Sequence, residues 1–90
     1  MKKLPLTFQK YGYRFAQVRR SENKAIYRQC IGERLVGYEV IKIRIRPKRY
    51  NTILKRKEPD KEVYPSKEEW GNWGWSCGNL EKALSRYNTL

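Results

Sequence analysis

Residues 41–46, IKIRIR, place cationic side chains at alternate positions of a short segment. A period of two predicts a β-strand with Lys42, Arg44 and Arg46 on one face and isoleucines on the other. Cations in succession, with no acidic residue between them, can contact the phosphates of nucleic acid. Two interpretations stay open: an anion-binding face, or only the solvated outer face of a strand.

The basic character continues beyond Pro47. Residues 47–62 are rich in lysine and arginine and have little apolar periodicity, so they are expected to form a long loop, with a short strand at 51–54 as an alternative. A loop that follows the strand directly would lie beside its cationic face. The candidate residues for binding nucleic acid or another anionic partner are therefore Lys42, Arg44, Arg46, Lys48, Arg49, Lys55, Arg56 and Lys57.

The net charge of +12 is unevenly distributed along the 90 residues. Residues 1–57 hold 17 Lys or Arg and 3 Glu, a balance of +14, whereas residues 58–90 hold 4 Lys or Arg and 6 Asp or Glu, a balance of −2. Such a basic segment attracts polyanions, with affinity that falls steeply as salt rises. The length predicts one domain with a small core, for which a homodimer or a bound partner would add stability.

Residues suited to catalysis are scarce. The chain has no histidine, so the usual general base and the histidine-containing triads are missing. Cys30 and Cys77 are too few for a zinc site and are expected to be buried or half-buried thiols. The clustered carboxylates Glu58, Asp60, Glu62, Glu68 and Glu69 offer a magnesium site as an alternative. Because Glu58, Asp60 and Glu62 lie in a lysine-rich stretch, local charge balance is the favoured interpretation. The sequence predicts a protein that is not an enzyme and has no metal or cofactor.

The remaining segments predict an α+β fold. Residues 13–20 and 24–31 form a hairpin, and 38–46 adds a third strand. Ser66 and Glu69 form an S-x-x-E capping box before a short helical turn in the Trp-rich segment. Asn79 caps a C-terminal helix in which apolar residues recur at helical spacing. The expected architecture is a small antiparallel meander of three to four strands, covered on one face by the Trp-rich segment and the helix. The corresponding division of the single domain is an N-terminal arm at 1–12, the meander at 13–46, the basic loop at 47–62 and the helical part at 63–90.

Aromatic residues supply both core and candidate stacking groups. Tryptophans 70, 73 and 75 are too large and apolar to remain together in water. At least two of them are expected to pack between the helix and the strand face formed by Ile41, Ile43 and Ile45. Tyr27 and Tyr38 are candidates for stacking on bases, with burial in the core as the alternative.

Taken in order, FAQVRR, NKAIYRQ, GYEVIKIRIR, YPSKEEWGNWGW and LEKALSRY resemble a group of small phage and mobile-element proteins. That group shares a Y-P-S-x-E-E-x-G-x-x-G-W segment before a terminal L-E-x-A helix, and the resemblance covers roughly residues 15–87. It implies a viral accessory protein that acts on nucleic-acid machinery. It carries no catalytic residue over, and the strongly basic stretch at 47–62 departs from the pattern.

Three functions remain open at this point. The first is an accessory protein that binds DNA or RNA, or a nucleic-acid-containing host complex, through the cationic strand face and loop. The second is an inhibitor that binds a host nuclease or defence complex, and the third is a minor structural protein of a virion. The sequence has no apolar run of transmembrane length and no signal-peptide core, so a cytoplasmic location is expected, with no membrane partner.

Overall fold

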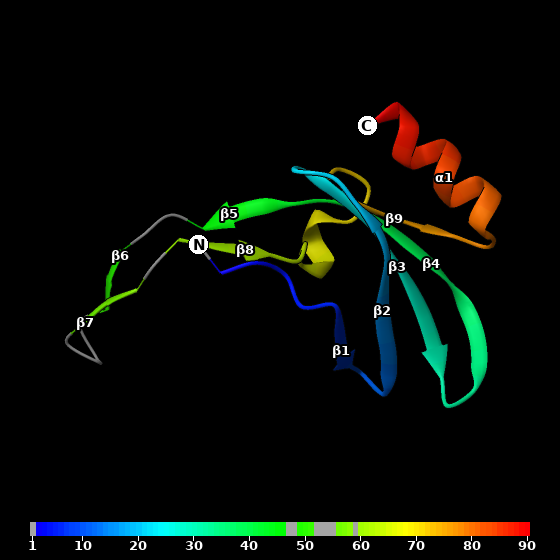
Figure 1. Cartoon of the computed structure of the whole chain (residues 1–90), viewed down its shortest axis with the longest axis horizontal. Coiled ribbons are helices and arrows are strands. Elements are labelled where there is room, and N and C mark those ends of the chain that lie inside the picture. Colours follow the sequence, from blue (N-terminus) through cyan, green and yellow to red (C-terminus); the bar gives the residue numbers. More distant parts are fainter. Residues whose placement is uncertain (1, 47–48, 52–55, 59) are drawn as a thin grey trace.

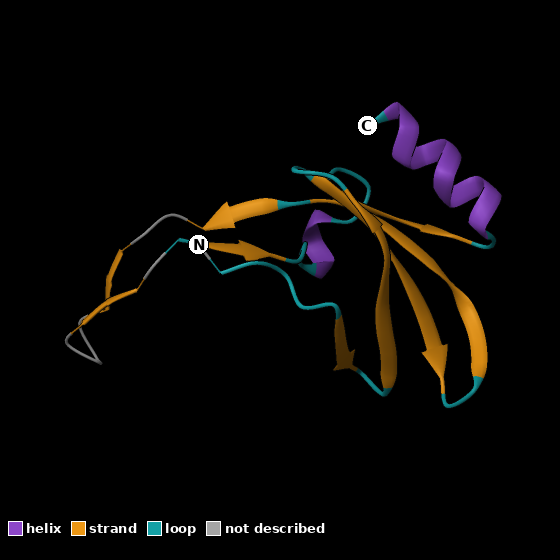
Figure 2. Ribbon diagram, in the orientation of Figure 1, coloured by secondary structure: helices purple, strands orange, loops and turns teal. Residues whose placement is uncertain are grey.

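The fold is built on a five-stranded antiparallel sheet (Figures 1 and 2). The computed structural model describes the backbone of residues 2–46, 49–51, 56–58 and 60–90, and the side chains of 2–46 and 60–90. The sheet has the order β1-β2-β3-β4-β9, so the predicted meander gains a strand at each edge. Its strands are β1 (Thr7–Lys10), β2 (Tyr13–Arg20), β3 (Lys24–Ile31), β4 (Arg34–Lys42) and β9 (Gly74–Cys77).

The strand predicted at 38–46 is divided in two. β4 ends at Lys42, and β5 (Arg44–Arg46) leaves the sheet to pair with β8 (Lys61–Val63). The division lies at Ile43, whose N–H donates to the carbonyl of Asn23 at 2.8 Å. Residues 47–62, expected to form a loop, include a second two-stranded ribbon made of β6 (Arg49–Asn51) and β7 (Arg56–Glu58).

The C-terminal helix forms as predicted, whereas the Trp-rich segment is not a helix. α1 spans Leu80–Thr89, and the side chain of Asn79 accepts from the N–H of Lys82 at 2.8 Å. The S-x-x-E motif produces a single 3-10 turn, η1 (Lys67–Glu69), in which the Glu69 carboxylate accepts from the backbone N–H of Ser66 at 2.9 Å. The chain then passes through a turn into β9.

The two faces of the sheet carry separate hydrophobic clusters. Val40 and Ile41 are neighbours in β4, so they point to opposite faces. The first face holds the cluster of Leu4, Phe15, Ala25, Tyr27, Ile41 and Ile43, and the second holds Ile26, Val40, Ala83 and Tyr87. α1 therefore covers the Val40 face, and the prediction that it covers the isoleucine face is wrong.

The tryptophans are divided between these faces. Trp70 packs on the Ile41 cluster, whereas Trp75 lies opposite Val40 in the β4–β9 pairing and so faces the α1 side. The prediction that two tryptophans lie between the helix and the isoleucines is therefore wrong. Ile45 is 53% exposed because β5 has left the sheet and has no apolar layer over it.

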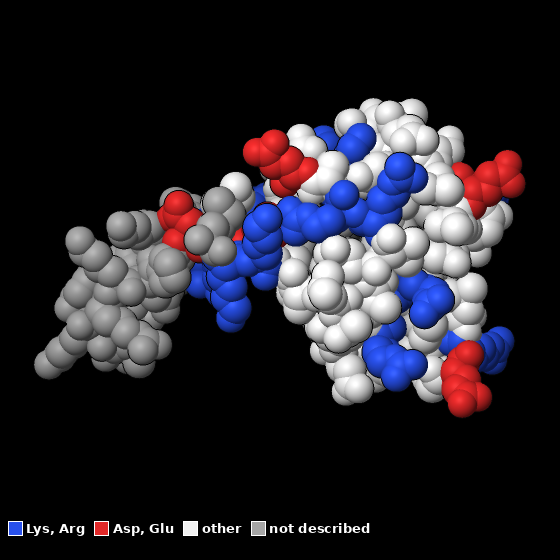
Figure 3. Space-filling view, in the orientation of Figure 1, with Lys and Arg blue, Asp and Glu red and all other residues white. Residues whose placement is uncertain are grey.

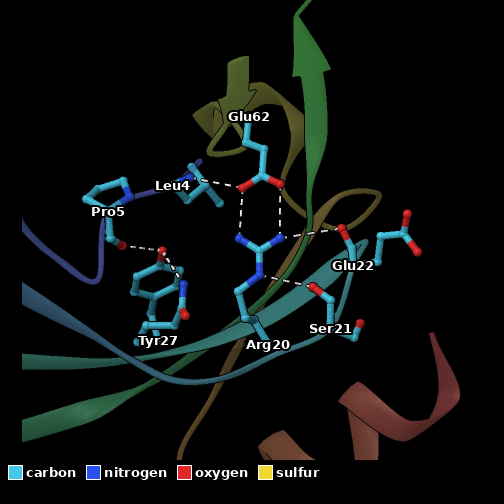
Figure 4. Close-up of polar contacts among 8 residues, drawn as sticks. Leu4, Pro5, Arg20, Ser21, Glu22, Tyr27 and Glu62 are labelled. Carbon is cyan, nitrogen blue, oxygen red and sulfur yellow. Dashed lines mark hydrogen bonds and ion pairs between the residues drawn. The ribbon is translucent and has the colours of Figure 1, made fainter. Parts of the chain in front are cut away.

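A partly buried ion pair joins β8 to β2 and to the N-terminal segment (Figure 4). Nη1 and Nη2 of Arg20 donate to the two oxygens of Glu62 at 2.8 and 2.9 Å. The N–H of Leu4 donates to the same carboxylate at 3.0 Å, and Arg20 Nε donates to the Ser21 carbonyl at 3.1 Å. The Arg20 guanidinium lowers the pKa of Glu62 from its ordinary value of 4.5 to about 2, and the Leu4 amide adds to this effect. Glu62 is thus a structural residue that fixes the position of the β5–β8 ribbon.

Gly37 permits the close approach of β9 to β4. A Cβ at this position would lie 2.9 Å from the carbonyl oxygen of Cys77, a backbone atom of the neighbouring strand. Gly37→Ala is expected to lower the free energy of unfolding by about 1–3 kcal/mol, because the strands must separate to admit the methyl group. Urea unfolding followed by fluorescence measures the change. The control is Gly78→Ala, where nothing lies within 4 Å of the added carbon. Equal stability of the two variants would contradict this explanation.

Candidate nucleic-acid interface

Cations from three elements alternate with two tryptophan rings beside the junction of β4 and β9. The Arg44 guanidinium lies 5.2 Å from the centre of the Trp73 ring, and Lys42 Nζ lies 5.9 Å from the same ring. Lys42 Nζ is also 5.8 Å from the Trp75 ring, over which the Arg86 guanidinium lies at 5.2 Å. We call these five residues the Trp–cation row.

Local sequence explains this arrangement. Lys42 is the last residue of β4, two positions after Val40, and so projects from the face that α1 covers. The N–H of Lys42 donates to the carbonyl of Trp73 at 2.8 Å, which holds the turn before β9 against the end of β4. Arg86 lies in the last turn of α1, where a cation also interacts favourably with the helix dipole.

The second cation of the strand has an acidic partner. Arg44 forms an ion pair with Glu69, the carboxylate that also closes the η1 turn. The pair is partly exposed, so solvent and salt weaken it, and it contributes little to stability. No local pattern predicts this pairing, because the two residues are 25 positions apart in the sequence. No acidic residue lies among the cations of 41–46 in the sequence, but the fold brings the Glu69 carboxylate next to Arg44.

The other basic candidates differ in what the structure shows of them. Arg46 is half-buried and has an interaction of its own. Arg49 belongs to β6, and Arg56 and Lys57 belong to β7, but their side chains lie outside the described residues. Lys48 and Lys55 also lie outside the described part of the chain. Of this set, Lys42 and Arg44 are the residues for which a position beside described aromatic rings is established.

The two tyrosine candidates belong to the hydrophobic clusters. Tyr27 is completely buried; its hydroxyl donates to the Pro5 carbonyl at 2.7 Å and accepts from Gln17 at 3.1 Å. Tyr27 therefore cannot stack on a base, and the alternative interpretation, burial in the core, applies to it. Tyr38 is half-buried and packs against the cluster beneath α1.

Sequence reasoning missed Trp73, Trp75 and Arg86 as site residues. The density of tryptophans at 70–75 is the sequence signal for the two tryptophans, but packing of at least two of these rings in the core was the favoured interpretation, with a partner-binding patch as the alternative. Trp73 and Trp75 are only half-buried, so part of each ring remains accessible. Figure 3 shows basic side chains gathered across this side of the molecule, from the region of β5 toward α1.

The described residues offer little else for chemistry. Among residues 2–46 and 60–90, no group of three or more His, Cys, Asp or Glu side chains could hold a metal ion. Cys30 and Cys77 are free, half-buried thiols. No helix in the described part of the chain is long and apolar enough to cross a membrane.

No family model matches this sequence, and comparisons with curated proteins and with solved structures find no similar chain.

Proposed function

We propose that this chain binds single-stranded nucleic acid through the Trp–cation row, without catalysis. The observation that carries the proposal is the placement of Lys42 and Arg44 against the accessible rings of Trp73 and Trp75. Proteins that bind single strands combine cations for the phosphates with aromatic rings on which bases stack. A solvated strand face needs no such rings, so their presence favours the anion-binding interpretation of residues 41–46.

The row suits a single strand better than a duplex. Stacking requires an unpaired base whose flat face can reach the indole, whereas a duplex offers its bases only at the groove edges. When a strand binds, Lys42 and Arg86 can turn from the rings toward phosphate oxygens while bases occupy the ring faces. The strongly positive chain supplies the long-range attraction.

Removing the strand cations should weaken binding to all base sequences alike. We expect the combined change of Lys42, Arg44 and Arg46 to Ser to flatten the plot of log affinity against log salt by about 1.5–2 units, because each phosphate contact on a single strand adds about −0.7. Fluorescence polarisation with a labelled oligo-dT of eight nucleotides, titrated at several salt concentrations, measures the slope.

Two control variants distinguish the effect of where the removed cations lie from the effect of the lower net charge. The combined change of Arg14, Arg28 and Arg34 to Ser removes the same charge from exposed positions elsewhere on the sheet. This control variant should lower the affinity less than the strand variant does. Most of the slope of log affinity against log salt should remain. Changes at Lys55, Arg56 and Lys57 test the basic stretch at 47–57. If that variant loses binding while the strand variant keeps it, residues 41–46 are only a solvated face.

One observation favours a protein partner as the second candidate. The β3–β4 hairpin carries exposed apolar side chains near its turn: Ile31, Leu35 and Val36 are 50%, 49% and 45% exposed. A group of this kind suits a protein contact. An inhibitor of a nucleic-acid-containing host complex would use this hairpin, and a partner that stays bound after nuclease digestion would support this function over the first.

A further inference from the structure

Aromatic residues line a pocket of about 280 Å³ on the opposite face of the sheet. Tyr13 and Phe15 come from β2, and Tyr64 and Trp70 come from the segment that follows β8. The Tyr64 and Trp70 rings are stacked, with centres 6.3 Å apart. The volume is near the small end of ligand sites, which suits one planar ring system.

The pocket wall formed by Trp70 is fixed in place. Its indole Nε1–H donates to Ser76 Oγ at 3.1 Å, and its ring lies so close to Gly74 that a Cβ there would be 2.5 Å away. The glycine therefore permits the ring to lie flat on the start of β9. A fixed ring loses little freedom when a ligand stacks on it.

A carboxylate among these rings gives the pocket a specific polar group. Glu39 accepts from the Tyr64 hydroxyl at 2.5 Å through Oε1, and burial raises the pKa of the Glu39 carboxyl. The Gln29 amide lines the same pocket. Glu39 is half-buried, and a carboxylate removed from water needs donors; Oε1 accepts from Tyr64, and both oxygens have lone pairs for further donors.

The charge around the opening distinguishes between two classes of ligand. Aromatic rings with a carboxylate suit a cation, such as a methylated lysine, as well as a nucleobase. Lys10 and Lys67 also line this pocket, and both are exposed. With a chain of net charge +12, they repel a cationic ligand and attract a base that carries a phosphate.

We propose that this pocket takes a single unstacked guanine base of a nucleic-acid strand. Guanine presents two adjacent donors, N1–H and N2–H, to a carboxylate such as Glu39, and its O6 accepts from an amide such as that of Gln29. Adenine, cytosine and uracil each place an acceptor beside their donor on this edge. Lys10 and Lys67 meet the phosphates on either side of the base. The inference rests on the proposed function, because the Trp–cation row holds the rest of the strand.

The first test compares different oligonucleotides with the wild-type protein, so its outcome does not depend on whether a variant folds. Oligo-dT of eight nucleotides is compared with the same strand carrying one central guanine, hypoxanthine, adenine or abasic position. Guanine should bind about tenfold tighter than adenine or the abasic strand, with hypoxanthine between them because it lacks the N2 amino group. Equal affinities for all these strands would overturn the inference.

Glu39→Gln then identifies the recognising group. It should abolish the preference for guanine while affinity for plain oligo-dT stays at the wild-type value; a preference that survives would overturn the role of the pocket. If none of the oligonucleotides binds, the proposed function is wrong. A titration with guanosine monophosphate then tests the pocket independently of that function. It should shift the NMR signals of Gln29 and of the Trp70 indole in the wild type but not in Glu39→Gln. Signals that move with a trimethyl-lysine peptide and not with the nucleotide would contradict the inference.

Discussion

Glu62→Gln is expected to lower the free energy of unfolding by about 2–4 kcal/mol, a large fraction of the total for a domain of this size. The change removes the negative charge that faces Arg20 in a site where the Glu62 side chain is only 5% exposed. It also weakens the acceptor for the Leu4 amide. Urea unfolding of the two proteins at neutral pH measures the difference.

The pH dependence follows from the same pair. The folded pKa of Glu62, about 2, lies below its ordinary value of 4.5, so the folded state binds its proton less readily than the unfolded state. The resulting stability is fully present above about pH 4.5 and is lost as the pH falls toward 2. The wild type should therefore lose stability over this range, while Glu62→Gln should change less.

Two controls accompany this measurement. Glu33→Gln removes an exposed carboxylate in the β3–β4 turn and should leave stability within about 0.5 kcal/mol of the wild type. The pair Arg20→Met and Glu62→Leu removes both charges, so it should recover part of the loss caused by Glu62→Gln alone. If the double variant is as unstable as the single one, burial of an unpaired Arg20 is not the cause.

Replacement of both Trp73 and Trp75 by Leu should reduce affinity for oligo-dT at least about 30-fold. Each base stacked on an aromatic ring contributes about 1–3 kcal/mol, and leucine has no ring face to offer. Leucine is chosen because it keeps apolar volume at two half-buried positions. Fluorescence polarisation at about 50 mM salt gives the affinities, since non-specific binding is strong there.

Tyr11→Leu is the matched aromatic control. Tyr11 is 79% exposed in the β1–β2 turn and lines the pocket on the opposite face, which oligo-dT, having no guanine, should leave empty. Its loss should leave affinity for oligo-dT unchanged. If the tryptophan variant binds as tightly as the wild type and remains folded by urea unfolding, the row is not a stacking surface.

Local patterns predicted the elements but not the layers. The spacing of Leu80, Ala83, Leu84 and Tyr87 predicted α1, and Asn79 predicted its start, because both signals depend only on neighbours in sequence. Alternation correctly predicted two faces for β4, where Val40 and Ile41 belong to separate clusters, but not that β5 leaves the sheet. It could not show which face the helix covers, since that depends on β9 pairing with β4.

The candidate site shows the same limit. Lys42 and Arg44 were visible in the sequence as cations on one side of a strand. Their partners, Trp73 and Glu69, are 25 or more positions away and meet them only because β9 and η1 return to the end of β4. The break at Ile43 was hidden because the alternation continues through it, although the chain changes from one pairing partner to another.

The most direct test of the proposed function follows the three indole N–H signals by NMR during a titration with oligo-dT at low salt. Trp73 and Trp75 belong to the row, and Trp70 lies on the opposite face. Because oligo-dT carries no guanine, the pocket beside Trp70 should stay empty. We predict that the Trp73 and Trp75 signals shift together as the strand binds while the Trp70 signal remains unchanged. Shifts confined to Trp70, or no shift of any indole at saturating oligo-dT, would contradict it.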